Sequence, residues 1–523
     1  MRWAIGCLCA LICLSCGAPG ALPMWSEPVL LSSCAPAPQA SQLSAAAPVI
    51  AAPVIVYPSS EPRARSGPGA LLWTAAQSCA GGAPLAFGAP LDAQGLPQAG
   101  RALGARGGGL AEVAAAVGTA DGQVLALGAR GNAAALAEGK TVGAFVDAEA
   151  LGGPSTPVAA ASGYLGDVAV VSAEMVSRRA TVSRKTTPPR ARVRARTRAA
   201  GSAKDTPHSA PRPVASGAHG AGWALDLRVQ RHYSSAPRTP LVLPVGNARP
   251  WAVAVAIDFR SDVLLVWASR GAIYAREVTQ AGRAEPVRRL SAVAGVPELR
   301  ALYSDDGRAI VAWREQRAVA SAAQSTSIAV SISDPALRFA APRTVERFVD
   351  LRGLVPPLGS LRLARLSSEA VMMAWTGVHA GRYVVRASPV SLRRGVWAPV
   401  VISGQPSSTL STASGSRPVQ ALLADLVPGP DAEAIALWTA APRARNGALD
   451  PNRRTIAAAW GHYGGHGEAR FAAPEAVSAP GPNGTPAAAF DPQNDMALAA
   501  WVTGVQAPRI VYAQREAGPP RAG

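Results

Sequence analysis

The amino-acid sequence predicts an all-β fold, a β-propeller of seven or eight four-stranded blades. The first observation behind this prediction is the stretch 251–291, where apolar runs of strand length alternate with short polar or glycine-containing turns. That pattern is typical of consecutive β-hairpins. The second observation is that pieces of this stretch recur before and after it along the chain. Repeats of one such unit bury their hydrophobic faces by packing against one another, which favours a ring of similar sheets.

The composition agrees with many short strands and turns. Of the 523 residues, 51 are glycine and 46 are proline, whereas charged residues make up only 16% and aromatic residues only 5%. Long solvated helices need more charge than this. Length alone is compatible with three or four domains or with one large repeat architecture, so the periodicity has to decide between them.

Eight apolar runs mark the expected second strand of each repeat, and most of them follow an acidic residue at a turn. These runs lie at 70–73, 121–127, 167–172, 262–267, 306–313, 369–375, 433–438 and 495–501. The last five end in a tryptophan, namely Trp267, Trp313, Trp375, Trp438 and Trp501. Successive tryptophans are 46, 62, 63 and 63 residues apart. Typical blades have about 40 to 50 residues, so the longer repeats need insertions in their loops.

The two ends of the chain carry incomplete repeats that complement each other. Residues 25–32 match 471–478 in frame and read as a fourth strand, whereas 486–516 supply three strands and no fourth. Pairing them closes the ring without an exposed sheet edge. An aromatic residue followed by proline marks the fourth strand elsewhere, because proline suits an edge strand. These aromatic residues are Phe87, Phe339, Trp397 and Phe471.

The N-terminus predicts export. Arg2 precedes an apolar run from Trp3 to Cys16, too short for the roughly 20 helical residues that cross a bilayer, so 1–20 is expected to be a signal peptide. Two maturation routes stay open. Ser15-Cys16-Gly17 resembles the end of a lipobox, which would place a lipid on Cys16, and the small residues that follow suit ordinary cleavage. Residues 21–516 then form the propeller and 517–523 a tail.

Cysteine usage agrees with an oxidising compartment. Outside the signal segment the chain has Cys34 and Cys79, which predict one disulfide, with two unpaired buried thiols as the alternative. No cysteine and histidine spacing typical of zinc is present outside that segment, so neither a metal nor another cofactor is expected. His462 and His466 are four residues apart, but the glycines around them favour a hairpin loop over a metal-binding helix.

A basic segment supplies ten of the positive charges of the chain, whose formal net charge is +18. Its residues are Arg178, Arg179, Arg184, Lys185, Arg190, Arg192, Arg194, Arg196, Arg198 and Lys204. The surrounding region, about 178–220, is rich in Pro, Ser, Thr and Ala and is expected to be a disordered insertion in the third repeat. If it binds, Arg190 to Arg198 would make salt-sensitive contacts to anionic polymers. Specific nucleic-acid binding is not expected, because no aromatic residues are interleaved.

The repeated tryptophans and turn acids each admit two interpretations. Indole rings bind sugars well, but these tryptophans end apolar runs such as 263–267, which favours packing between blades. The turn acids are Asp262, Asp306, Glu369, Glu433 and Asp495. One acid per repeat at a turn is expected to hydrogen-bond the turn itself, and paired catalytic carboxylates are the less favoured interpretation.

These marks together resemble the secreted bacterial β-propellers with sialidase-like repeats, over most of residues 25–516. In that family a turn Asp or Gly precedes a strand that ends in Trp. Ser304-Asp305-Asp306-Gly307 approaches the Asp-box of sialidases, but the glycine comes one position early and Trp313 lies too far downstream. The resemblance therefore implies the fold and export, and sialidase activity is not carried over.

The function expected from the sequence is that of an exported, non-catalytic binding or scaffold protein, monomeric, with a protein or glycan partner. Membrane attachment would come only through a lipid on Cys16. A glycan-active hydrolase or lyase on the same fold is the first alternative, and it would need acids and arginines that converge at the central channel. Binding of polyanions through the Arg-rich insertion is the second alternative.

Overall fold

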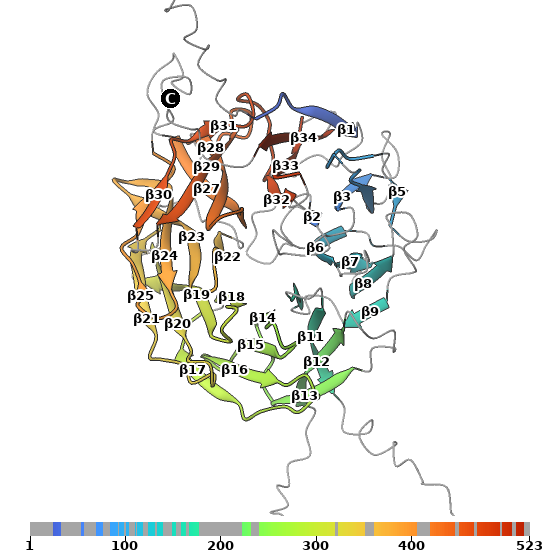
Figure 1. The fold of residues 1–523 in the computed structure, drawn as a ribbon, viewed down its shortest axis with the longest axis vertical. Coiled ribbons are helices and arrows are strands. Elements are labelled where there is room, and N and C mark those ends of the chain that lie inside the picture. Colours follow the sequence, from blue (N-terminus) through green and yellow to red (C-terminus); the bar gives the residue numbers. More distant parts are fainter. Residues whose placement is uncertain are drawn as a thin grey trace, which may run out of the picture.

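The computed structural model shows an eight-bladed β-propeller. It describes residues 25–32, 54–56 and 69–76, segments of 84–176, and 222–516 with gaps at 232–239, 296, 320–322, 351–359, 405–418, 445–448, 465–467, 492–493 and 505–508. Eight antiparallel sheets of four or five strands stand in a ring, and the first strand of each lies nearest the centre (Figure 1). The predicted fold class is thus confirmed, with eight blades.

The blades follow one another in chain order. Blades one and two hold Val54–Val56 (β2), Ala70–Ala76 (β3), Pro84–Pro90 (β4), Arg101–Ala102 (β5), Glu112–Gly118 (β6), Val124–Arg130 (β7), Ala133–Gly139 (β8) and Glu149–Gly152 (β9). Blades three and four hold Val158–Ser162 (β10), Val168–Val176 (β11), Gly222–Gln230 (β12), Leu241–Gly246 (β13), Ala252–Ile257 (β14), Val263–Ser269 (β15), Ala272–Val278 (β16) and Arg288–Ala292 (β17). The last four of these are the strands predicted within 251–291.

The second half of the ring repeats this order. Blades five and six hold Glu298–Tyr303 (β18), Ala309–Val319 (β19), Ala323–Ile332 (β20), Arg343–Val349 (β21), Leu361–Arg365 (β22), Ala370–His379 (β23), Arg382–Ser391 (β24), Gly395–Val396 (β25) and Val400–Val401 (β26). Blades seven and eight hold Val419–Pro428 (β27), Glu433–Pro442 (β28), Thr455–Gly464 (β29), Glu468–Phe471 (β30), Glu475–Ala476 (β31), Ala487–Asp491 (β32), Met496–Thr503 (β33) and Arg509–Glu516 (β34).

The N-terminal strand closes the ring. Val29–Ser32 (β1) pairs with β34 and becomes the fourth strand of blade eight (Figure 1). The register aligns Val29 with Tyr512 and Leu30 with Val511, and a bulge follows before Ser32. Two hydrogen bonds extend the pairing, from Ser26 N to Gln514 O at 2.7 Å and from Gln514 N to Ser26 Oγ at 3.0 Å. This closure covers the edge of β34 that would otherwise be free.

The second strands are buried on both faces because each lies between two neighbouring blades. Val263–Ser269 has every residue buried, which explains why its sequence is apolar without alternation. Trp267 packs with Leu225 and Leu227 of blade three, whereas the neighbouring Val266 packs with Leu299 of blade five. Successive residues thus serve opposite interfaces, as the period of two in a strand requires.

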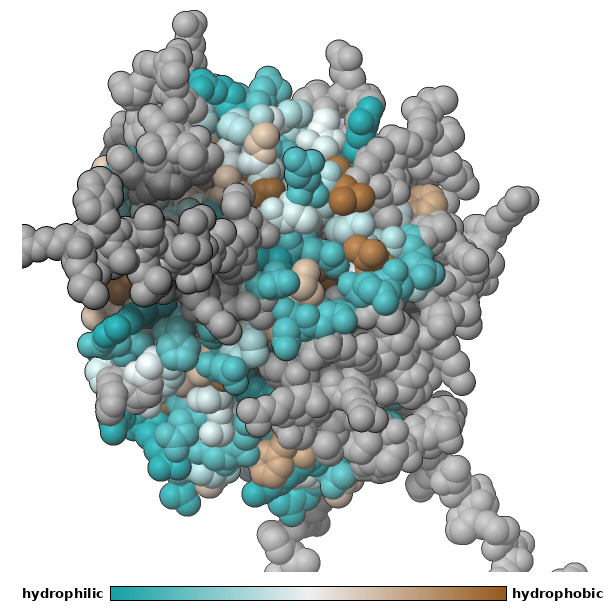
Figure 2. All heavy atoms as spheres, turned by 45° about the horizontal axis from the view of Figure 1, so that its top comes forward, coloured by the Kyte–Doolittle hydropathy of each residue, from teal (hydrophilic) through white to brown (hydrophobic). Residues whose placement is uncertain are grey.

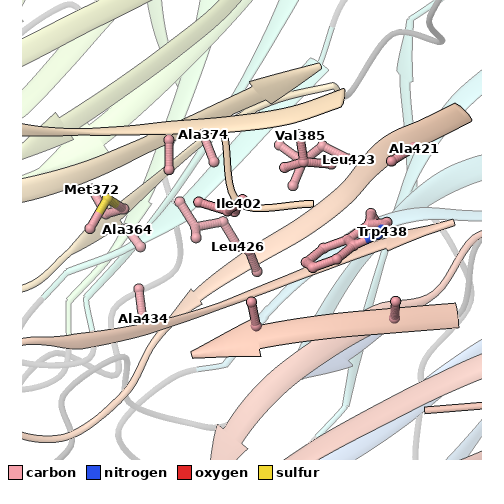
Figure 3. Close-up of a cluster of buried hydrophobic side chains, with 14 of the residues drawn as sticks. Ala364, Met372, Ala374, Val385, Ile402, Ala421, Leu423, Leu426, Ala434 and Trp438 are labelled. Atoms are coloured by element: carbon pink, nitrogen blue, oxygen red, sulfur yellow. The ribbon is translucent and has the colours of Figure 1, made fainter. Parts of the chain in front are cut away.

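Each of the five tryptophans lies at a different blade interface. Trp267, Trp313, Trp375, Trp438 and Trp501 are at most 2% exposed. In the interface between blades six and seven, Trp438 belongs to one cluster with Leu423 of its own blade and with Val385 and Met372 of the preceding blade (Figure 3). The hydrophobic core is therefore divided into wedges between blades, and the tryptophan of a blade packs against the blade before it.

The prediction that Phe87 marks a fourth strand is wrong. Phe87 lies in β4, the third strand of blade one, and not in the fourth. It stands opposite Trp73 in the register, with ring centroids 6.1 Å apart. Pro90 is the last residue of β4, where a proline is tolerated without marking an outer strand. Of the other three aromatic residues, Phe471 lies in the outer strand β30, Trp397 directly follows β25, and Phe339 precedes β21 by four residues.

Candidate functional site

Charged side chains gather on the first strands of blades five to seven, three neighbouring blades of the eight that surround the central axis. We call Glu298, Arg300, Arg362 and Asp425 the channel network. In blade four, by contrast, the first strand reads Ala-Val-Ala-Val-Ala-Ile. Since the first strand of each blade has no neighbour on its inner side, its backbone N–H and C=O groups need other partners.

The channel network supplies such partners across blades. Leu361 N donates to Glu298 Oε1 at 3.2 Å, and Arg300 Nε donates to Leu361 O at 3.1 Å. Arg300 and Glu298 also pair with each other, with Nη2 to Oε1 at 2.8 Å. Two side chains of blade five thus hold both backbone groups of one residue in blade six.

The same connection continues around the ring. Arg362 Nε lies 3.3 Å from Asp425 Oδ1, and Ala488 N donates to Asp425 Oδ2 at 3.0 Å. Both pairs join residues 63 positions apart, as does the bond from Leu361 to Glu298. Trp375, Trp438 and Trp501 are also 63 residues apart, so Arg362, Asp425 and Ala488 occupy corresponding places in blades six, seven and eight.

Burial sets the electrostatics of the network. It lowers the pKa of Arg300 from its usual value, an effect that the nearby Glu298 carboxylate opposes. Glu298 is only 5% exposed in its side chain, and its Oε2 has no hydrogen-bond partner in the described part of the chain. A carboxylate fixed between a guanidinium and a backbone N–H in this way stabilises an ion pair, and it is poorly placed for proton exchange with a substrate.

A second buried carboxylate belongs to blade five. Asp350 accepts hydrogen bonds from Thr326 Oγ1 at 2.6 Å, from Tyr383 Oη at 3.1 Å and from Gln316 Nε2 at 3.3 Å. Tyr383 N in turn donates to Gln420 Oε1 of blade seven at 2.8 Å. Three consecutive blades are thus joined by one polar network whose central carboxylate accepts three side-chain hydrogen bonds.

The loops at one rim of the ring carry the longest insertions. In an antiparallel blade, strands two and four end at the same rim, which we call the insertion rim. The segment 177–221 links β11 to β12 there, and 405–418 links β26 to β27. Insertions in repeat proteins tend to collect on the binding face. Arg178 to Lys204, including Arg190, Arg192, Arg194, Arg196 and Arg198, lie in the first segment, outside the described residues.

Described residues of the insertion rim include a small aromatic and basic group. Trp251, just before β14, is 39% exposed, and Met175, at the end of β11, is 65% exposed. The Arg249 guanidinium stands 5.6 Å over the ring of Trp223. Figure 2 shows one face on which hydrophobic residues are scattered among hydrophilic ones. Exposed aliphatic residues scattered singly are ordinary, whereas exposed tryptophan and arginine are enriched in contact surfaces.

The opposite rim holds the predicted turn acids. Gln280 N donates to Asp262 Oδ1 at 2.6 Å, and Arg308 N donates to Asp306 Oδ1 at 3.2 Å. Glu369 pairs with Arg393 at 3.0 Å, and Asp495 has a positive φ of 50°. Glu433 differs from the others, because burial raises its pKa to about 7. Desolvation also raises the pKa of Asp258, although Arg260 N and Asp262 N donate to it, each at 2.8 Å.

Several predicted sites fall outside the described residues. They are the signal segment with Cys16, the disulfide candidates Cys34 and Cys79, and the Arg-rich insertion. In the described parts of the chain, no group of three or more His, Cys, Asp or Glu side chains is arranged to hold a metal ion. No described helix is long and apolar enough to cross a membrane. The sequence reasoning missed the channel network, although the 63-residue spacing could have pointed to it.

The chain has only distant similarities to known proteins. No protein-family model matches the chain, and no curated protein matches it. Among solved structures, the polysaccharide lyase Uly1 is 9% identical, with 76% of this chain and 88% of that one covered at a TM-score of 0.38. A Lactobacillus plantarum protein is 11% identical, with 79% and 98% covered at 0.38. The Penicillium chrysogenum α-L-arabinanase is 12% identical, with 71% and 100% covered at 0.32. At these values the similarities carry no argument about this chain.

Proposed function

We propose that this chain is an exported, non-catalytic β-propeller that binds a protein or glycan partner through its insertion rim. The observation that carries the proposal is how the two acidic residues of the channel network are bound. Glu298 and Asp425 are each held between a guanidinium and a backbone N–H of the next blade. Their charges serve to join blades, which leaves neither carboxylate free for acid or base catalysis.

Of the two rims of the ring, the insertion rim is the better candidate for a contact surface. It receives the longest loops, and Trp251 with Arg249 provides an aromatic and basic surface near the first strand of blade four. Both residue types are enriched where binding energy concentrates. The apolar run that follows Arg2 supports export, because a short apolar run after a positive charge is typical of a signal peptide. An exported protein would meet its partner outside the cytoplasm.

The experiment measures binding and cleavage together on a panel of neutral and acidic polysaccharides. Trp251→Ala and Arg249→Ala are expected to weaken binding about tenfold or more, because truncating a central contact costs at least about 1–2 kcal/mol. Val400→Ala, also at an exposed position, is the matched control. Release of reducing ends or unsaturated sugars that Glu298→Gln abolishes would overturn the non-catalytic proposal in favour of a hydrolase or lyase.

Polyanion binding is the second candidate, favoured by the ten positive charges of residues 178–204. Deleting this segment is expected to lower the salt concentration at which the protein leaves a heparin column, since each lost phosphate or sulfate contact reduces the salt dependence. Elution at an unchanged salt concentration would exclude polyanion binding through this segment and would not affect the proposal of a protein or glycan partner.

A further inference from the structure

The junction between blades seven and eight, where the ring closes, holds an unusual set of buried charges. Trp25, which precedes β1, packs there with Trp460 of β29 and Trp501 of β33. Arg515 of β34 is 1% exposed, and its Nη2 lies 2.9 Å from Oε1 of Glu475 in β31. We call Trp25, Glu433, Trp460, Glu475 and Arg515 the closure junction.

Arg515 is the centre of the closure junction. Its guanidinium stands 4.9 Å from the centroid of the Trp460 ring, so the cation lies against an aromatic face as well as beside Glu475. Burial lowers its pKa, and the charges of Glu475 and Glu433 oppose that effect. Asp431, in the turn before β28, adds a further negative charge near Glu433. One buried cation therefore interacts with two carboxylates, Glu475 and Glu433, and a third carboxylate, Asp431, acts on Glu433.

The turn before Glu433 packs closely against Trp460. A Cβ on Gly429 would lie 3.2 Å from Trp460 Cζ3 and 3.4 Å from Glu433 Cβ, so the turn, the indole and the carboxylate side chain are in close contact. In the described structure, four buried polar atoms of the junction lack a hydrogen-bond partner: Glu433 Oε2, Glu475 Oε2, Trp25 Nε1 and Trp460 Nε1. A negative charge on Glu433 is poorly compensated there.

The strand that seals this junction is also weakly held. β1 has four residues, and three of them pair with β34 across a bulge. Arg515 lies on β34, the strand to which β1 pairs. A change in charge at the junction therefore acts on the last strand pair of the ring, where few hydrogen bonds oppose separation.

We propose that the closure junction is a pH-responsive seal of the propeller, in which ionisation of Glu433 loosens β1 from β34. The groups that face Glu433 are Asp431 on its own turn, Glu475 on β31 and Arg515 on β34, with His462 opposite it in the register of β29. Protonated Glu433 leaves Arg515 paired with Glu475. Ionised Glu433 leaves an excess negative charge, which opening and hydration of the junction relieve.

The direction follows from the pKa of Glu433, which desolvation and the charge of Asp431 raise from 4.5 to about 7. A carboxyl whose pKa is raised on folding contributes stability below its unfolded pKa. That contribution is lost as the pH rises through the folded value. The seal is therefore closed in acid and loosens between about pH 5 and 8.

The test compares thermal unfolding and hydrogen exchange of the full chain between pH 5 and 8.5. In the wild type, Tm and the protection of residues 25–32 are expected to fall together as the pH rises. Glu433→Gln should remove most of this fall and keep the protection high at pH 8.5. Glu468→Gln, at a side chain that is 70% exposed, is the matched control and should behave like the wild type.

A second variant keeps the proposal testable if Glu433→Gln fails to fold. Asp431 is exposed with a positive φ of 51°, a conformation that asparagine tolerates, so Asp431→Asn should fold normally. Removing its charge is expected to move the pH midpoint of the loss in Tm to lower pH, because the repulsion that raises the pKa of Glu433 is then weaker. An unmoved midpoint, or residues 25–32 whose protection does not depend on pH, would overturn the proposal.

Discussion

Arg362 Nε lies 3.3 Å from Asp425 Oδ1 and joins the first strands of blades six and seven at the central axis. The two side chains are 26% and 23% exposed, so water screens the pair only in part. Asp425 also accepts a hydrogen bond from Ala488 N of blade eight. The pair thus links three consecutive blades through side chains where no strand pairing connects them.

A double-mutant cycle with Arg362→Met and Asp425→Asn tests this link. The coupling energy from chemical denaturation is expected to be about 1–2 kcal/mol, because partly buried partners in one network interact more strongly than exposed ones. Arg470 and Glu468, 3.1 Å apart and 84% and 70% exposed, form the control pair. Their coupling should be about 0.5 kcal/mol or less. Equal couplings for the two pairs would contradict a structural role for the channel network.

Trp375 tests the packing between blades five and six. It is fully buried, and its Nε1 donates to Glu346 of the preceding blade. Trp375→Ala is expected to lower the free energy of unfolding by about 3–5 kcal/mol, the usual cost of truncating a buried aromatic side chain. Trp251→Ala, at a 39% exposed position, should change it by about 0.5 kcal/mol or less. A small loss for Trp375→Ala would show that this interface contributes little to stability.

Tyr383 tests the buried network around Asp350. Its hydroxyl donates to Asp350 Oδ1 at 3.1 Å, and the residue is completely buried. Tyr383→Phe removes this donor and is expected to cost about 1–3 kcal/mol, measured by denaturation in urea. Tyr463→Phe, at a half-buried position, is the matched control with an expected change near zero. A stability unaffected by Tyr383→Phe would mean that water replaces the hydroxyl without loss.

Closure by the N-terminal strand predicts a change in association. Deleting residues 25–32 removes β1 and uncovers the edge of β34, whose backbone groups can then pair with another copy of the chain. The deleted protein is expected to form dimers or larger species in size-exclusion chromatography with light scattering. Deleting 517–523 is the control and should leave the elution unchanged. A monomeric protein without β1 would argue against this role of the strand.

Much of the fold could be predicted from the sequence, because its strands and its closure leave recognisable patterns. The strands of 251–291 and the eight second strands were predictable because buried strands read as apolar runs. Closure was predictable because residues 25–32 match another fourth strand in frame. Phe87 was misplaced because an aromatic residue followed by proline occurs at the end of a third strand as well as beside a fourth.

The sequence by itself determined that the chain repeats a small antiparallel sheet and closes on its own N-terminal strand, since both follow from local periodicity. Only the tertiary structure decided what the charged residues do. Glu298 reaches Leu361 of the next blade, and Arg362 reaches Asp425, across 63 residues each. Whether such a charge faces a ligand or a neighbouring backbone depends on how the blades pack around the axis, and no pattern within one repeat records that arrangement.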